Sequence, residues 1–117
     1  MSIKLKQLYF ALDLKDDPEL IAEYKKWHRT ENAWPEITQS IRQAGIENME
    51  IYLTGNRLFM VMEVTDDFDQ AAKNNSDANN PVVQKWETMM NLYQQTLPWS
   101  RPGEKWVALE AIYKLPT

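Results

Sequence analysis

The segment that decides the fold is MEIYLTGNRLFMVMEV, residues 49–64. Residues 49–53 and 57–64 are rich in aliphatic and aromatic side chains, and the pair Gly55-Asn56 lies between them. Two such runs joined by a short glycine-containing turn are typical of a β-hairpin. We therefore predict two antiparallel strands here, with the chain reversing at Gly55.

The residues before the hairpin predict one strand and two helices. Residues 7–14, QLYFALDL, contain no glycine or proline and favour a strand. Asp17 and Pro18 then supply an N-cap and a helix-initiating proline for a helix that runs to about residue 28. A second helix is expected over residues 34–44, because a glycine, the typical residue after a helix C-terminus, follows it.

The residues after the hairpin predict two more helices and a final strand. A short helix is expected around residues 68–72, followed by an irregular polar segment at 74–80. Pro81 begins another helix. Residues 97–104 contain two prolines and a glycine and are expected to form a loop, and Trp106–Tyr113 is predicted to be the last strand.

The predicted order is strand, helices, strand, strand, helices, strand. It matches the split β-α-β arrangement of a ferredoxin-like α+β domain, in which helices cover one face of an antiparallel sheet. Residues 58–62 and 107–109 are continuously apolar, although a sheet face that meets water should alternate with polar residues. We therefore expect a second copy of the sheet to cover the other face, which makes the protein a homodimer.

The composition limits the classes of protein to which the chain can belong. Its 117 residues suit a single domain over 1–117, and 44% hydrophobic with 26% charged residues is typical of globular proteins. No apolar run approaches the roughly 20 residues of a membrane span, and Lys4 and Lys6 interrupt the region where a signal peptide would be apolar. The chain has no cysteine, and a net charge of −4 argues against nucleic acid as a partner. We expect a cytoplasmic protein with no membrane or nucleic-acid partner.

The single histidine of the chain, His28, is the first candidate for chemistry. Tyr24 precedes it by one helical turn, so both side chains lie on the same helix face, and Trp27 and Trp34 are close in sequence. An imidazole titrates near neutral pH and can give and take a proton. A lone histidine on a helix is also often a surface or packing residue, and Tyr24 and Trp86 are equally compatible with a core role.

Two carboxylates, Glu63 and Glu110, lie within otherwise apolar predicted strands. A buried carboxylate needs a hydrogen-bonding or charged partner, so each is either paired structurally or part of a site. The chain has no glycine-rich phosphate loop, nucleophile elbow or zinc-type histidine cluster. This inventory favours simple acid–base chemistry with no cofactor and no metal.

Several short motifs, taken in order along the chain, resemble the L-rhamnose mutarotase family. They are Tyr24-x-x-x-His28, Trp34-Pro35-Glu36, Ala44-Gly45-Ile46 with Asn48, Ile51-Tyr52-Leu53, Leu58-Phe59 with Glu63, Gln84-Lys85-Trp86, and Glu110-Ala111-Ile112-Tyr113. Residues 11–18, 55–60 and 102–107 are similar to the branch of the family assigned to L-fucose. The resemblance implies a ferredoxin-like, dimeric α/β barrel that interconverts the anomers of a monosaccharide without a cofactor.

The resemblance also implies roles for individual residues. His28 matches the family's proton donor, Tyr24 a sugar-binding tyrosine, and Trp86 the first of two adjacent sugar-binding tryptophans. Glu87 replaces the second tryptophan, and Met49 replaces a sugar-contacting tyrosine. These differences, with a spacer after His28 that is two residues longer than in the rhamnose branch, predict a pocket altered for a different 6-deoxyhexose.

Mutarotation requires an acid at the ring oxygen and a base at the anomeric hydroxyl group, and both steps are proton transfers. We expect His28 to act at the ring oxygen, with the base among Glu63, Glu87 and Glu110. Two other interpretations stay open on the sequence. One is a haem-binding or cofactor-free monooxygenase of the dimeric ferredoxin-like class, in which His28 would bind haem iron, and the other is a non-catalytic dimeric binding module.

Overall fold

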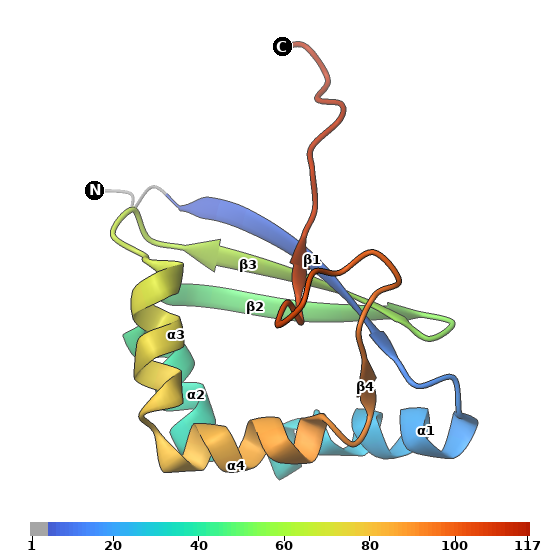
Figure 1. The fold of residues 1–117 in the computed structure, drawn as a ribbon. Helices are drawn as coiled ribbons and strands as arrows, with labels where there is room; N and C mark the ends of the chain where they lie inside the picture. The colour runs from blue at the N-terminus through green and yellow to red at the C-terminus, as the bar shows by residue number, and fades with distance from the viewer. Residues whose placement is uncertain (1–4) are drawn as a thin grey trace.

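The computed structural model describes residues 5–117, which form one antiparallel sheet with helices on one side of it (Figure 1). The strands are β1 (Lys6–Leu14), β2 (Ile46–Thr54), β3 (Arg57–Val64) and the short β4 (Gln94–Gln95) and β5 (Val107–Ala108). Their order is β2-β3-β1-β4, and β5 pairs with β1 beside β4. The first strand is therefore central, as the split β-α-β prediction requires.

The predicted hairpin is present and turns at the expected place. Thr54 pairs with Arg57, and Gly55 has a φ of +57°, a left-handed conformation that glycine adopts without steric penalty. Arg57 also pairs with Asp13 across β1, where its guanidinium donates to both carboxylate oxygens at 2.8 and 3.2 Å. This bidentate contact fixes the register of β3 against β1 at the same end.

The helices are α1 (Pro18–Trp27), the 3₁₀ turn η1 (Thr30–Asn32), α2 (Pro35–Gln43), α3 (Gln70–Ala78) and α4 (Pro81–Met90). Three of them begin with a proline, and Asp17 and Asn80 accept backbone hydrogen bonds from the first turns of α1 and α4. Asp17, Pro18 and Pro81 thus begin helices as predicted, and Asn80 adds a cap that was not predicted from the sequence. No helix within residues 5–117 is long and apolar enough to cross a membrane.

The core lies between the inner face of the sheet and the helices. Alternate residues of β3 point inward and are buried, namely Leu58, Met60, Met62 and Val64. Two apolar clusters share this layer: one around Leu14, Tyr24 and Tyr93, and one around Ile46 and the inner side chains of β3. Trp106 contacts both clusters and joins them.

The prediction of an irregular segment at 74–80 was wrong, because α3 continues to Ala78. Asp69 is the N-cap of the helix, and its carboxylate accepts hydrogen bonds from the backbone N–H groups of Ala71 and Ala72. One turn apart, Gln70 donates to Asn74 and Lys73 pairs with Asp77. These i,i+4 side-chain pairs stabilise a helix whose composition is polar throughout.

The predicted last strand, Trp106–Tyr113, is also much shorter in the structure. Only Val107 and Ala108 pair with β1, and the N–H of Leu109 donates to the carbonyl of Tyr9 at 2.9 Å. The chain then leaves the sheet and runs away from the body of the molecule (Figure 1). Along this tail the apolar residues Ile112, Tyr113 and Leu115 are 89, 75 and 73% exposed, because no other part of the described chain covers them.

Candidate active site

A cavity of about 980 Å³ lies between the sheet and the helices. Its wall includes the five residues to which the family resemblance pointed for catalysis or binding: Tyr24, His28, Met49, Trp86 and Glu87. A smaller hollow of about 440 Å³ adjoins it, shares His28 and Met49, and is also lined by Arg42 and Glu47. Side chains more than 60 positions apart in sequence therefore line one open-sided cavity.

Tyr24 and His28 face each other at the C-terminal end of α1. Their ring centroids are 4.2 Å apart, and His28 Nδ1 lies 2.7 Å from the backbone carbonyl oxygen of Tyr24. A carbonyl oxygen can only accept, so Nδ1 donates this bond and carries a hydrogen. In the neutral imidazole, Nε2 then has a free lone pair.

The surroundings of His28 set its charge. His28 is exposed as a whole residue, but the rings of Tyr24 and Trp86 partly bury its imidazole. This burial lowers the pKa of His28 below its usual 6.5, while the hydrogen bond to the Tyr24 carbonyl acts in the opposite direction. At neutral pH the ring is therefore uncharged, and Nε2 is available as a proton acceptor.

Two tryptophans extend this aromatic wall. The Trp86 ring from α4 lies 5.6 Å from His28 and 5.0 Å from Trp34, at angles of 70° and 71°. Trp34 caps α2 directly before Pro35, and Lys85 holds its ammonium 6.0 Å from the centre of the Trp34 ring.

The Tyr24 side chain contacts β4. Its hydroxyl oxygen accepts a 3.4 Å hydrogen bond from Nε2 of Gln94 in β4, and burial raises the pKa of the phenol above its usual 10.0. The other amide atom, Gln94 Oε1, is buried and has no hydrogen-bond partner among the described residues. A buried acceptor without a partner destabilises a protein by about 1–3 kcal/mol. A donor that reached it through the cavity would remove this penalty.

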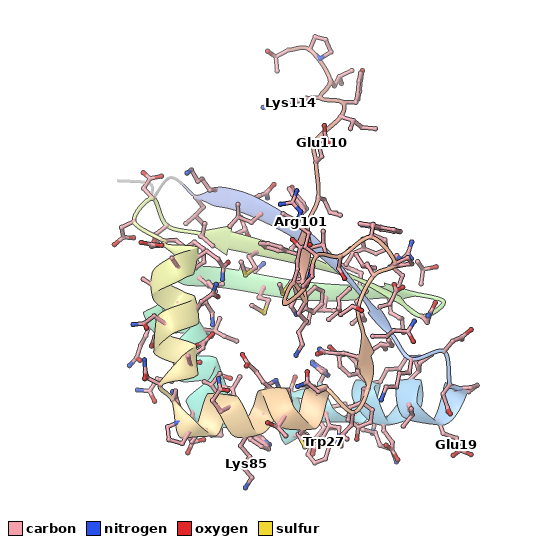
Figure 2. The ribbon with its side chains drawn as sticks, viewed as in Figure 1. Glu19, Trp27, Lys85, Arg101, Glu110 and Lys114 are labelled. Atoms are coloured by element: carbon pink, nitrogen blue, oxygen red, sulfur yellow. The ribbon has the colours of Figure 1, made fainter. Side chains whose placement is uncertain are left out.

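Two of the three carboxylates considered as the base lie away from the cavity. Glu63 points to the opposite face of the sheet, where Asn48 Nδ2 donates to it at 3.3 Å, because its neighbours Met62 and Val64 point inward. Glu110 belongs to the tail beyond β5 (Figure 2). Only Glu87 of the three lines the cavity.

Two cavity residues carried no signal in the sequence. Gln94 lies in a two-residue strand that no apolar pattern marks, and Lys105 lies in a loop of mixed composition. Both reach the cavity only because the chain returns to β1 after α4. Residues 5–117 hold no group of three or more His, Asp or Glu side chains arranged for a metal ion.

Comparison with known proteins identifies the family. Residues 7–115 match the sequence profile described as L-rhamnose mutarotase. The chain belongs to the L-rhamnose mutarotase family. This mutarotase chain is 46% identical to an L-fucose mutarotase of Xanthomonas campestris pv. campestris over 113 residues, which cover 97% of this chain and 90% of the relative. It is 30% identical to an L-rhamnose mutarotase of Jannaschia sp. over 92% of this chain and 97% of the relative.

Solved structures support the mutarotase fold. A crystal structure of an L-rhamnose mutarotase from Formosa agariphila superposes with a TM-score of 0.67 at 24% identity, over 95% of this chain and 99% of that one. Tetracenomycin F2 cyclase from Streptomyces glaucescens superposes over the same shares with a TM-score of 0.58 at 12% identity. At such identities the likeness concerns the fold, and it confirms the α+β prediction.

Proposed function

We propose that the protein interconverts the α and β anomers of a 6-deoxyhexose, with L-fucose as the preferred sugar. The observation that carries the proposal is the state of His28: its Nδ1 is held by the Tyr24 carbonyl, its ring is neutral at pH 7, and Nε2 is free beside Trp86 in the cavity. A neutral imidazole in this position suits general acid–base chemistry. The mutarotases among the relatives support the same reaction class.

In this proposal His28 acts first as the base. Nε2 removes the proton of the anomeric hydroxyl group while an acid protonates the ring oxygen, and the bond between the anomeric carbon and the ring oxygen breaks. The open aldehyde rotates, the ring closes on its other face, and the imidazolium returns the proton. The sequence predicted a proton donor at the ring oxygen; a neutral ring with a free Nε2 favours an acceptor during opening and a donor during closure.

The remaining wall residues suit sugar binding. A pocket of about 300–1,000 Å³ is the usual size for small ligands, and the cavity lies within this range at about 980 Å³. The Trp86 indole offers an apolar surface for the C–H side of a pyranose, and Gln94 Oε1 offers an unused acceptor for a sugar hydroxyl group. The Tyr24 phenol is neutral at pH 7, and its raised pKa keeps it so at higher pH, so its hydroxyl group can donate a hydrogen bond to the sugar.

The choice of L-fucose rests on the relatives and on two positions of the wall. The chain is 46% identical to the L-fucose mutarotase and 30% identical to the L-rhamnose mutarotase described above. Glu87 and Met49, which replace aromatic residues of the rhamnose branch, both line the cavity. A carboxylate in place of an indole favours hydrogen bonding to a hydroxyl group over stacking.

Saturation-transfer NMR tests the proposal. The anomeric protons of L-fucose, L-rhamnose and D-glucose are irradiated in turn, with and without protein, and the spontaneous exchange is subtracted. We expect the largest acceleration for L-fucose and none for D-glucose. Sugar binding without acceleration would instead favour a binding module, and a Soret band on adding haem would favour the monooxygenase interpretation.

We also propose that the protein is a homodimer in which the outer face of the sheet is covered. Tyr9 and Tyr52 are 43 and 54% exposed there, and Phe59 and Val61 lie between them in the ladder. An uncovered apolar face beside an apolar tail supports a second copy as the partner. Light scattering should give twice the chain mass of 13.8 kDa, and a monomer at micromolar concentration would refute this.

A further inference from the structure

The cavity wall contains a lysine whose position is fixed on both sides. Residues 101–104 form a turn in which the Glu104 N–H donates to the Arg101 carbonyl at 2.9 Å, while the Arg101 N–H donates to Glu104 Oε1 at 3.1 Å. On the other side, Trp106 packs against both apolar clusters. Lys105 lies between these anchors, half-buried in the wall of the cavity that contains His28.

Glu87 is the counter-charge of Lys105. It follows Trp86 on α4, is half-buried in the same wall, and accepts a 3.3 Å hydrogen bond from Gln84 Nε2. Burial lowers the pKa of Lys105 below its usual 10.5, and the negative charge of Glu87 acts against this decrease. The lowered pKa makes the Lys105 ammonium an easier proton donor than a solvated lysine, and the charge of Glu87 favours its protonated form.

The other charged groups of the wall are Arg29, the ion pair Lys73–Asp77 on α3, and Glu104 in the turn, and the adjoining hollow adds Arg42 and Glu47. Arg29 directly follows His28, but a guanidinium does not release its proton near neutral pH. Lys73 and Asp77 neutralise each other at 2.5 Å. Glu104 is bound to the backbone of its own loop. Lys105, supported by Glu87, is thus the cation of this wall suited to give up a proton in the cavity that His28 lines.

We propose that Lys105 is the acid partner of His28. This inference rests on the proposed mutarotase function and assigns the second proton transfer. The Lys105 ammonium donates a proton to the ring oxygen as His28 Nε2 takes the anomeric hydroxyl proton, so that the carbon–oxygen bond of the ring breaks and an aldehyde and a free hydroxyl group form. On closure that hydroxyl group returns its proton to Lys105 Nζ, and the imidazolium returns the other to the anomeric oxygen, with no net change.

Glu87 is less suited to this role than Lys105. Ring opening needs one group with a free lone pair and one with a transferable proton at the same pH. The Glu87 carboxylate, which offers its negative charge to Lys105, would supply a second base beside His28 and no acid. Glu87 is instead a positioning residue, because its charge holds the proton on Lys105.

The test is the pH dependence of anomer exchange in four variants, measured by saturation-transfer NMR with L-fucose from about pH 5 to about pH 10 and corrected for spontaneous exchange. Lys105→Met keeps the apolar stem and removes the proton; we expect kcat to fall roughly 10²-fold and the alkaline decline of the parent to disappear. Lys105→Arg keeps the charge, but a guanidinium does not release its proton below about pH 12, so the same loss is expected. Lys25→Met, on the exposed side of α1, is the matched control and should behave as the parent.

Glu87→Gln gives a second readout in a protein that retains Lys105. Removing the carboxylate lowers the pKa of Lys105 further, so the alkaline decline should move to lower pH. A parent without any catalysed exchange would refute the mutarotase proposal itself. An active parent whose alkaline decline persists in Lys105→Met, or stays in place in Glu87→Gln, would refute only the role of Lys105. If Lys105→Met does not fold, as judged by circular dichroism, the Glu87→Gln result decides.

Discussion

Replacing His28 by glutamine is the most direct perturbation of the proposed mechanism. Glutamine can still donate a hydrogen bond to the Tyr24 carbonyl, but its amide does not exchange protons near neutral pH. Loss of one general acid–base group slows a reaction by roughly 10²- to 10⁴-fold, which corresponds to about 3–5 kcal/mol of transition-state stabilisation. The catalysed anomer exchange of L-fucose should fall by at least the lower factor.

The same substitution should leave the fold intact. The imidazole contributes one 2.7 Å hydrogen bond and two aromatic contacts, each worth about 0.5–1.5 kcal/mol, against a typical unfolding free energy of about 5–15 kcal/mol. Saturation-transfer NMR measures the exchange, and circular dichroism and urea unfolding of the same samples report the fold. A folded His28→Gln variant with the parental exchange rate would remove the histidine from the mechanism.

The pH dependence of the parent follows from the lowered pKa of His28. Activity requires the neutral ring, so the rate should be retained at neutral pH and lost as the pH falls through a value below 6.5. In His28→Gln this acidic decline should disappear, since the group that titrates is gone. A parental rate that instead rises as the imidazole becomes protonated would show that the imidazolium acts first, contrary to the proposed order.

Three further predictions concern the binding wall, the core and the dimer. Trp86→Ala should weaken L-fucose binding about tenfold or more in a tryptophan-fluorescence titration, whereas the exposed Trp99→Ala should not; equal affinities would remove the indole from the site. Leu12 is 0% exposed, so Leu12→Ala should lower the free energy of unfolding in urea by about 2.7–5 kcal/mol. Leu92 is 59% exposed, so Leu92→Ala should lower it by less than about 0.5 kcal/mol. Similar values for both variants would contradict the described core. Ile112→Asp in the tail should convert the proposed dimer into a 13.8 kDa monomer in light scattering, and an unchanged mass would exclude the tail from the interface.

The fold was predictable wherever the deciding interactions are local. Asp17 and Asn80 cap helices that begin at the next residue, and Gly55 turns a hairpin whose two strands are neighbours in sequence. The errors occur where side-chain pairs or distant strands decide. The pairs along α3 stabilise a helix that its composition does not indicate. The length of β5 is set by its pairing with the distant strand β1, which involves only Val107 and Ala108.

The site follows the same division. Tyr24 and His28 could be paired from the sequence because a four-residue spacing places them on one helix face. Gln94 could not, since it meets Tyr24 across 70 positions of the chain and through a strand of two residues. The position of Glu63 outside the cavity could have been predicted from the sequence. Strict alternation along β3 places it outward, but the continuous apolar run around it obscured that alternation.

Partial burial in the cavity wall explains why His28 and Lys105 suit opposite proton-transfer roles. Burial acts in the same direction on the two cations and lowers the pKa of each. The imidazole starts near 6.5, so a decrease leaves it neutral at pH 7, and its backbone carbonyl partner leaves Nε2 free. The ammonium starts near 10.5, and the charge of Glu87 beside it favours the protonated form. One low-dielectric wall thus yields a base and an acid at the same pH, which is what the opening of a pyranose ring requires.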